Sequence, residues 1–303
     1  IEMLDDEIAG RLTISDQAIT VTGEISADEA RELSETTTGL LTATILETPI
    51  NDLMNDLPLF TDNALTIRLT DPSVDAQDLM DLGSSTSLSI DASEVTEITG
   101  EFGFIYHVYR GMQGQFLGIE DANLAVTGDL NVFLANLLDA RTTTGTIAGS
   151  ITSETVEALK TLTGVNEYSI TINAADATST TAADLNEINA LTSDTVNLIN
   201  VTALAASSLS DLDTLEAAIT NNEFSNATGL TTIEVTDTTI DATALASTID
   251  SYDEINGEST TGMTLAAGAT INVDASEVIE MLDDEIAGRL TISDQAITVT
   301  GEI

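Results

Sequence analysis

Apolar and polar residues alternate along most of this chain in two rhythms. Stretches such as LTATI at 41–45 and SITIN at 169–173 alternate apolar residues with Ser or Thr, which is the period-two pattern of a half-buried strand. Each is followed by apolar residues at helical spacing, as in INDLMNDL at 50–57 and TAADLNEINAL at 181–191. The pattern therefore predicts short strands, each followed by a short helix.

This strand–helix unit recurs ten times, and its average length of about 28 residues is near that of a leucine-rich-type repeat. The predicted units begin at Leu12, Leu40, Leu65, Leu88, Leu124, Thr146, Ser169, Val196, Leu230 and Met263. Strands joined by helical crossovers pair in parallel, and such crossovers are right-handed. We therefore expect an α/β repeat solenoid of short parallel strands alternating with short helices, in which each unit covers the apolar face of the next.

The opening segment of the chain, IEMLDDEIAGRLTISDQAITVTGEI at 1–25, returns without a change at 279–303. Ile1 thus corresponds to Ile279, and Ile25 corresponds to Ile303. A repeated fold tolerates sequence drift, so identity over this length indicates a periodic polymer. Residues 1–10 are then the end of a preceding unit, 11–288 one complete period, and 289–303 the start of the next period.

An aromatic insertion at 101–120 interrupts the rhythm and makes the fourth unit the longest. Its candidate interface residues are Phe102, Phe104, Tyr106, His107, Tyr109, Arg110 and Phe116. FIYHVY is apolar on both alternating faces, which favours a strand that needs cover on both sides. Two hypotheses follow: a protruding hairpin that docks on a neighbouring array, with Arg110 meeting acidic surface, or an inserted loop that packs back on its own solenoid.

The chain carries 52 acidic and 7 basic residues, a net charge of −45. Such a chain repels nucleic acid and anionic membranes and attracts cations, and the charge also keeps it soluble. Repulsion of this size is screened by salt, which suggests a saline or calcium-bearing medium. The sequence has no apolar run long enough to cross a bilayer, so no membrane span is expected.

Calcium is the metal that this composition favours, because hard cations prefer oxygen ligands. Two clusters are candidate Ca²⁺ ligands: Glu120, Asp121 and Asn123, and Asp283, Asp284 and Glu285. Neither cluster lies in an EF-hand loop. Part of the acidity has a local explanation, because the DASEV segments at 91–95 and 274–278 have the spacing of helix capping boxes.

Catalytic motifs are missing from the sequence. It contains no HExxH, GxSxG or Walker pattern, no Cys and a single His, so a His-dependent active site could use only His107. Carboxylate pairs are frequent, but 52 acidic residues create such pairs by chance. We therefore expect a protein that is not an enzyme.

The run TTAADLNEINALTSDTVNLINVTAL at 180–204, together with the two DASEV segments, resembles the Thr/Ala/Asp-rich tandem repeats of giant cell-surface proteins of bacteria, cyanobacteria among them. The resemblance implies an exported, very long, non-enzymatic protein tied to the cell envelope, motility or adhesion. It offers no catalytic residues, and the insertion at 101–116 is not part of the family pattern.

These observations together predict an extracellular structural repeat protein that self-associates into a fibre, a giant cell-surface filament or an adhesin, with cations or polysaccharide as further partners. The alternatives are a surface-layer lattice protein and a carbohydrate-active solenoid enzyme. A string of three Ig-like domains of about 93 residues is a further alternative, but the helical patterns argue against an all-β fold.

Overall fold

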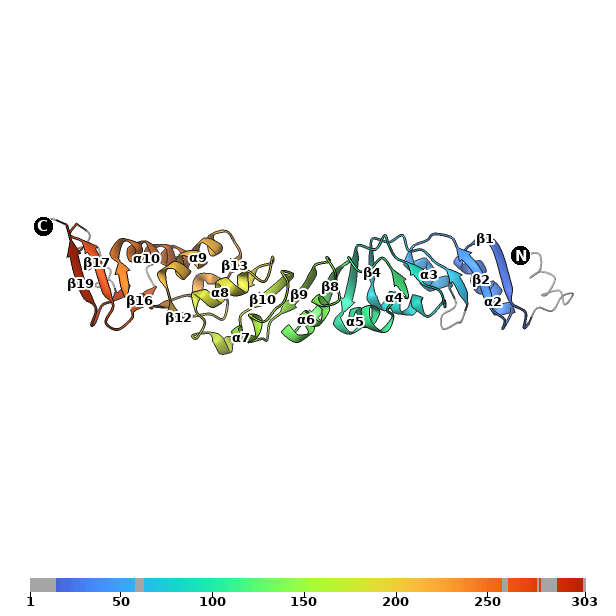
Figure 1. The fold of residues 1–303 in the computed structure, drawn as a ribbon, viewed down its shortest axis with the longest axis horizontal. Coiled ribbons are helices and arrows are strands. Elements are labelled where there is room, and N and C mark those ends of the chain that lie inside the picture. Colours follow the sequence, from blue (N-terminus) through green and yellow to red (C-terminus); the bar gives the residue numbers. More distant parts are fainter. Residues whose placement is uncertain (1–14, 58–62, 258–260, 277, 279–287, 302–303) are drawn as a thin grey trace. The chain divides into compact units, whose positions relative to one another are not determined.

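The computed structural model describes residues 15–57, 63–257, 261–276, 278 and 288–301 (Figure 1). The chain divides into two compact units, here called lobes. The first lobe contains residues 1–128 and 137–149, and the second contains residues 129–136 and 150–303. Both are mixed α/β structures with parallel sheets. Strand β8 (Asn123–Asp129), helix α6 (Val132–Asp139) and strand β9 (Ile147–Ile151) contain residues of both lobes.

The first lobe contains three groups of paired strands. They are β1 (Ile19–Ile25), β2 (Leu41–Ile45) and β3 (Ala64–Thr66); β4 (Ser73–Asp75), β6 (Glu97–Glu101) and β8 (Asn123–Asp129); and β5 (Ile90–Asp91) with β7 (Phe116–Leu117). The helices that alternate with them are α2 (Ala27–Thr36), α3 (Ile50–Asp56), α4 (Ala76–Gly83) and α5 (Phe102–Gly111).

The second lobe repeats this organisation. Its strand groups are β10 (Glu167–Thr171), β11 (Val196–Asn197) and β13 (Phe224–Ser225); β12 (Ala203–Ser207), β14 (Thr232–Val235), β16 (Gly262–Leu265) and β18 (Leu290–Thr291); and β15 (Thr239–Asp241), β17 (Thr270–Asp274) and β19 (Ala296–Thr300). Its helices are α7 (Val156–Leu159), α8 (Ala182–Asn189), α9 (Leu209–Thr220) and α10 (Ala242–Asn256), with 3₁₀ turns η1 (Ala174–Asp176) and η2 (Ala227–Gly229).

Paired strands are close neighbours in the sequence. In the first lobe Ile19 of β1 is paired with Leu41 of β2, and helix α2 connects the two strands. In the second lobe Thr239 of β15 is paired with Thr270 of β17, and helix α10 lies in the connection. Both pairs are parallel, as a crossover through a helix requires. The predicted α/β class with parallel strands is confirmed.

The core of each lobe is built mainly from aliphatic side chains. Ile240 and Ile271, paired across β15 and β17, are both completely buried. The helices contribute residues at helical spacing, such as Leu185 and Ile188 of α8. With 3% aromatic residues the chain has few large rings to bury, so thin layers of Leu, Ile, Val and Ala fill the interior.

Three local predictions were wrong. The aromatic segment forms helix α5 and not a strand, because Ile105 and Val108, three positions apart, both turn into the core. A short run that is apolar throughout fits either period, and sequence alone does not decide between them. The apolar run that begins the unit at Val196 forms a strand only at 196–197, and the run that begins the unit at Met263 is two strands, β16 and β17, separated by a turn.

The first DASEV segment, at 91–95, begins no helix. Asp91 accepts a hydrogen bond from the Ser93 amide at 3.1 Å in a turn, and strand β6 follows. In the second segment Asp274 accepts from the Ser276 amide at 3.0 Å, while Glu277 lies outside the described residues. Ser and Asp side chains compete with helical hydrogen bonds in this way.

Capping boxes do form elsewhere. They are Ser26 with Glu29 at the start of α2, and Thr181 with Asp184 at the start of α8. No helix in the described part of the chain is both long enough and apolar enough to cross a bilayer.

Candidate functional site

Helix α5 carries a cationic and aromatic surface. The rings of Phe102 and Tyr106, one helical turn apart, stack with centroids 5.4 Å apart and planes 13° from parallel. The Arg110 guanidinium carbon lies 5.7 Å from the Tyr106 centroid, and Arg141, which follows α6 in the sequence, lies 5.9 Å from the same centroid. Cations at these distances are attracted to the face of an aromatic ring.

We call Phe102, Tyr106, His107, Arg110 and Arg141 the α5 patch. A hollow of about 340 Å³ lies on it, lined by Gly103, Tyr106, His107, Arg110 and Gly111. His107, Arg110 and Arg141 are exposed, whereas the two stacked rings are half-buried. The patch therefore presents positive charge and aromatic edges to solvent, on a chain of net charge −45.

The opposite side of the aromatic segment belongs to the core of the first lobe. The Tyr109 hydroxyl donates to the Ile119 carbonyl at 2.8 Å. Burial raises the pKa of Tyr109, and the nearby charges of Glu120 and Asp121 raise this pKa further, so the hydroxyl remains protonated. Phe116 is buried in β7, and Phe104 is half-buried. The seven predicted interface residues therefore divide between the surface and the interior.

The other described basic residues are paired with carboxylates. Arg68 contacts Glu47 at 2.7 Å, Glu94 at 3.0 Å and Asp91 at 3.5 Å. Arg289 contacts Asp253 at 3.2 Å and Asp250 at 3.3 Å, and Arg31 pairs with Asp28. Arg110 and Arg141 have no carboxylate partner within the part of the chain that the structure describes. They are the basic groups that remain open to an acidic partner.

Lys160 joins two neighbouring helices of the second lobe. Its ammonium group lies 2.8 Å from the Asp184 carboxylate and 3.5 Å from that of Glu187, both on α8, and 3.6 Å from Glu157 on α7. Burial acts to raise the pKa of Asp184, but hydrogen bonds from Lys160 and from the hydroxyl and amide of Thr181 outweigh burial and lower it. The folded state therefore favours the ionised carboxylate.

We expect Asp184→Asn to lower the free energy of unfolding by about 1 kcal/mol at pH 7, after allowing for solvent screening of this partly exposed pair. Because the folded pKa lies below the ordinary 3.8, the contribution is present above pH 3.8 and is lost as the pH falls through the folded value. Urea unfolding at pH 7 and pH 2.5 checks this. Glu187→Gln is the control. If Asp184→Asn were destabilised relative to the parent protein by the same amount at pH 2.5 as at pH 7, the ionised Asp184 carboxylate would not be the source of the stability.

The predicted calcium ligands do not converge. Asp121 accepts from the Thr144 hydroxyl at 2.9 Å, and Asn123 accepts from the Thr146 amide at 2.9 Å. Asp283, Asp284 and Glu285 lie outside the described residues. Within the described ranges, no three His, Asp or Glu side chains gather as metal ligands would. Calcium binding remains a prediction.

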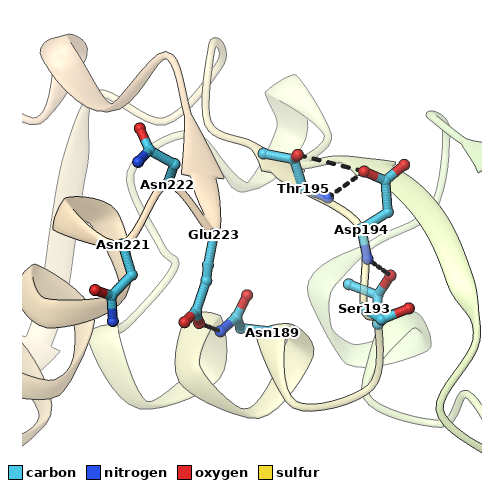
Figure 2. A pocket seen from close by; sticks show the side chains of 8 residues that line it. Asn189, Ser193, Asp194, Thr195, Asn221, Asn222 and Glu223 are labelled. Carbon is cyan, nitrogen blue, oxygen red and sulfur yellow. Dashed lines mark hydrogen bonds between the residues drawn. The ribbon is translucent and has the colours of Figure 1, made fainter.

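A polar hollow of about 410 Å³ lies in the second lobe. Its lining is Asn189, Thr192, Ser193, Asp194, Thr195, Asn221, Asn222 and Glu223. Figure 2 shows that its two carboxylates point to different partners: Glu223 accepts from the Asn189 amide at 2.5 Å, and Asp194 accepts from the Thr195 amide at 2.7 Å. The two carboxylates of this hollow thus bond to other groups of the protein and not to each other.

Buried threonines that follow a helix bond back to the backbone at or just before a strand that precedes that helix, and sequence reasoning missed them. The Thr86 hydroxyl donates to the Leu65 carbonyl at 2.8 Å, and the Thr192 hydroxyl donates to the Tyr168 carbonyl at 2.7 Å. Thr37 does the same with the Gln17 carbonyl at 2.5 Å. We call these three residues the threonine latches. A Thr followed by Ser or Thr just after each helix was the signal that could have identified them.

The backbone supports each latch. The amide of the residue after each latch also donates to a carbonyl just before a preceding strand: Thr38 to Ser15 at 2.8 Å, Ser87 to Asn63 at 2.8 Å and Ser193 to Asn166 at 2.8 Å. A backbone bond and a side-chain bond thus act together at each of these three connections.

Comparison with protein-family models, with curated proteins and with solved structures finds no match for this chain.

Proposed function

We propose that this chain is a non-enzymatic extracellular structural repeat protein, an α/β solenoid strung into a fibre, a giant cell-surface filament or an adhesin. The observation that carries the proposal is the recurrence of one connection in both lobes: two parallel strands joined through a helix, as between Ile19 and Leu41 or Thr239 and Thr270. The threonine latches add a second connection between successive units. Each unit packs on its sequence neighbours, which is the organisation of a repeat array.

The role follows from the direction of these bonds. In a stack of parallel strands, backbone hydrogen bonds lie across the strands, along the axis of stacking. A load along the axis is then carried by backbone bonds at each step, with a hydroxyl latch added at Thr37, Thr86 and Thr192. Away from the α5 patch, the acidic surface repels neighbouring fibres and attracts cations, Ca²⁺ among them. Such an array is suited to forming a filament. Catalysis does not require an array of this kind.

Imaging and fibre diffraction of the native assembly test the proposal. We expect filaments with an axial spacing of about 4.8 Å between strands, and an advance of roughly 48 Å per period if each of ten units forms one coil. The advance is nearer half that value if two units form a coil. Compact particles joined by linkers would contradict the proposal, and two-dimensional crystals would favour the surface-layer alternative.

The α5 patch is proposed as the contact between filaments. Deleting 101–116 is not a suitable test, because Ile105, Val108 and Phe116 are buried and their loss would damage the core. Substituting Arg110→Gln together with Arg141→Gln leaves the core intact. We expect the double variant to weaken lateral association about tenfold at low salt, because the two open cations meet acidic surface.

Light scattering against protein concentration measures this effect. The matched control is Arg31→Gln, because the Arg31 guanidinium is already paired with Asp28 on its own helix. The difference between the double variant and the parent should vanish at high salt, where charges are screened. If the double variant and the parent associated equally at low salt, the α5 patch would not be part of the contact between filaments.

A further inference from the structure

The segment that occurs twice in this chain uses opposite edges in its two copies. In the first copy, β1 lies at the edge of its sheet and pairs with β2, which follows it in the sequence. In the second copy, β19 lies at the edge of its sheet and pairs with β17, which precedes it. Both edge strands are labelled in Figure 1. One sequence thus makes two different pairings, each on one side of the strand.

The two pairings use alternate backbone groups and do not compete. The Ile19 amide donates to the Leu40 carbonyl at 2.9 Å, so residue 19 faces β2. The Ala296 amide donates to the Ala269 carbonyl at 2.9 Å, so residue 296, which corresponds to 18, faces the β17 side. Successive residues of a strand direct their backbone groups to opposite sides. Ile297, which corresponds to Ile19, therefore directs its amide to the open edge of β19.

Side chains show the same complementarity. Ile297 and Val299 continue the apolar column of Ile271 and Val273, their partners in β17, yet are 43% and 45% exposed. In the first copy the same two side chains, Ile19 and Val21, are half-buried, and Ile19 is paired with the buried Leu41. The exposed pair lacks the neighbour that the identical pair has in the first lobe.

The backbone bends in the same way at Gly23 in the first copy of the segment and at Gly301 in the second. Gly23 and Gly301 both have left-handed φ angles, 107° and 93°. A Cβ on Gly301 would lie 3.0 Å from the Asp274 carboxylate, whereas none of the described atoms lies within 4 Å of the same point on Gly23. The first copy therefore has room on the side where the second copy carries β17.

We propose that the open edge of β19 is a docking edge for one occupant: a further copy of residues 26–45, which form α2 and β2, carried by the next period of the same polymer. The proposal rests on the proposed function and specifies its junction. The strand order across the junction is then β15, β17, the shared strand, β2 and β3, and Ile240, Ile271, the shared isoleucine and Leu41 form one apolar column.

The experiment uses the full chain extended after Ile303 by a second copy of residues 26–57, compared with the parent chain by amide hydrogen exchange. We expect the exchange of Ile297 and Val299 to slow by about 100-fold or more, because their amides become bonded in a covered sheet. The control extension carries Asp in place of Ala30, Leu41 and Ala43 of the added copy, and should leave the exchange unchanged.

A second extension tests the other side of the same strand. Residues 242–278 placed before Ile1 should slow exchange at Ala18 and Thr20, the residues that correspond to 296 and 298. Unchanged exchange at Ile297 and Val299 in the first extended chain overturns the proposal, whether the added residues fold elsewhere or not at all. Amide exchange at Ile297 and Val299 reports on this one edge only. Exchange could therefore stay unchanged although native filaments are observed, and it could slow although no filament forms.

Discussion

Replacing Gly145 by Ala is expected to lower the free energy of unfolding by about 3 kcal/mol, at the upper end of the usual range for overpacking. A Cβ at this position would lie 2.1 Å from the carbonyl oxygen of Ala122 and 2.7 Å from its carbonyl carbon. These atoms belong to the backbone of the preceding strand–helix unit and cannot rotate away. The two units would have to separate, which would disturb the bond from the Thr143 amide to the Glu120 carbonyl at 3.0 Å.

Gly39 provides an independent test of the same mechanism. Both glycines end a TTTG sequence, at 36–39 and 142–145. A Cβ on Gly39 would lie 2.2 Å from the carbonyl oxygen of Gln17 and 2.3 Å from its carbonyl carbon. We expect Gly39→Ala to be destabilising to a similar extent, for the same reason.

The control for both substitutions is Gly103→Ala. Gly103 lies in helix α5, and none of the described atoms lies within 4 Å of the point where its Cβ would be. Ala is favoured over Gly in helices, so Gly103→Ala should stabilise the protein by about 0.5–1 kcal/mol. Urea unfolding of the three variants measures the differences. If Gly145→Ala and Gly103→Ala had the same free energy of unfolding, the backbone at Gly145 would not lie as close to the Ala122 carbonyl as described.

The predictable part of the fold was the part that depends on periodicity. LTATI and INDLMNDL have clear strand and helix periods, and they form β2 and α3 at the expected places. The parallel pairing followed from the order of strands and helices, since a strand returning through a helical crossover must be parallel to its predecessor. Segments with clear amphipathic faces therefore folded as their patterns indicated.

The unpredicted part depends on contacts between units. Whether FIYHVY forms a strand or a helix is decided by which neighbours cover it, and Ile105 and Val108 fit the core as a helix. The α5 patch also needs Arg141, which is distant from Tyr106 in the sequence and comes near it only in the fold. The threonine latches of Thr86 and Thr192 bond to carbonyls 21 and 24 residues earlier in the chain, so the Thr-Ser signal after a helix marks the donor but does not identify its acceptor.

Replacing Thr192 by Val is expected to lower the free energy of unfolding by about 2 kcal/mol, although the two side chains have almost the same shape. The Thr192 hydroxyl donates to the Tyr168 carbonyl at 2.7 Å, lies 3.1 Å from the Asn166 carbonyl, and accepts from the Asp194 amide at 3.1 Å. Val offers neither donor nor acceptor. The substitution removes these three interactions and packs a methyl group against polar backbone atoms that it cannot bond.

Thr232→Val is the matched control, because Thr232 is exposed on β14 and Val is well suited to a strand. It should change the stability by less than about 0.5 kcal/mol. Thr86→Val should behave like Thr192→Val, since Thr86 is equally buried and donates to the Leu65 carbonyl at 2.8 Å. Urea unfolding measures all three variants. If Thr192→Val and Thr232→Val had the same free energy of unfolding, the Thr192 hydroxyl would contribute no stability beyond the packing of its side chain.

Amide exchange in Thr192→Val separates a latch from an ordinary buried hydrogen bond. In an array, stability is a sum of terms within units and between neighbours, so weakening one connection lets the two sides open independently. The Ser193 amide, bonded to the Asn166 carbonyl at 2.8 Å across the same connection, should then exchange faster than amides inside α8 or α9. A uniform acceleration through the second lobe would instead mean that Thr192 stabilises the lobe as a whole. The connection between units would then have to reside in the backbone pairing alone.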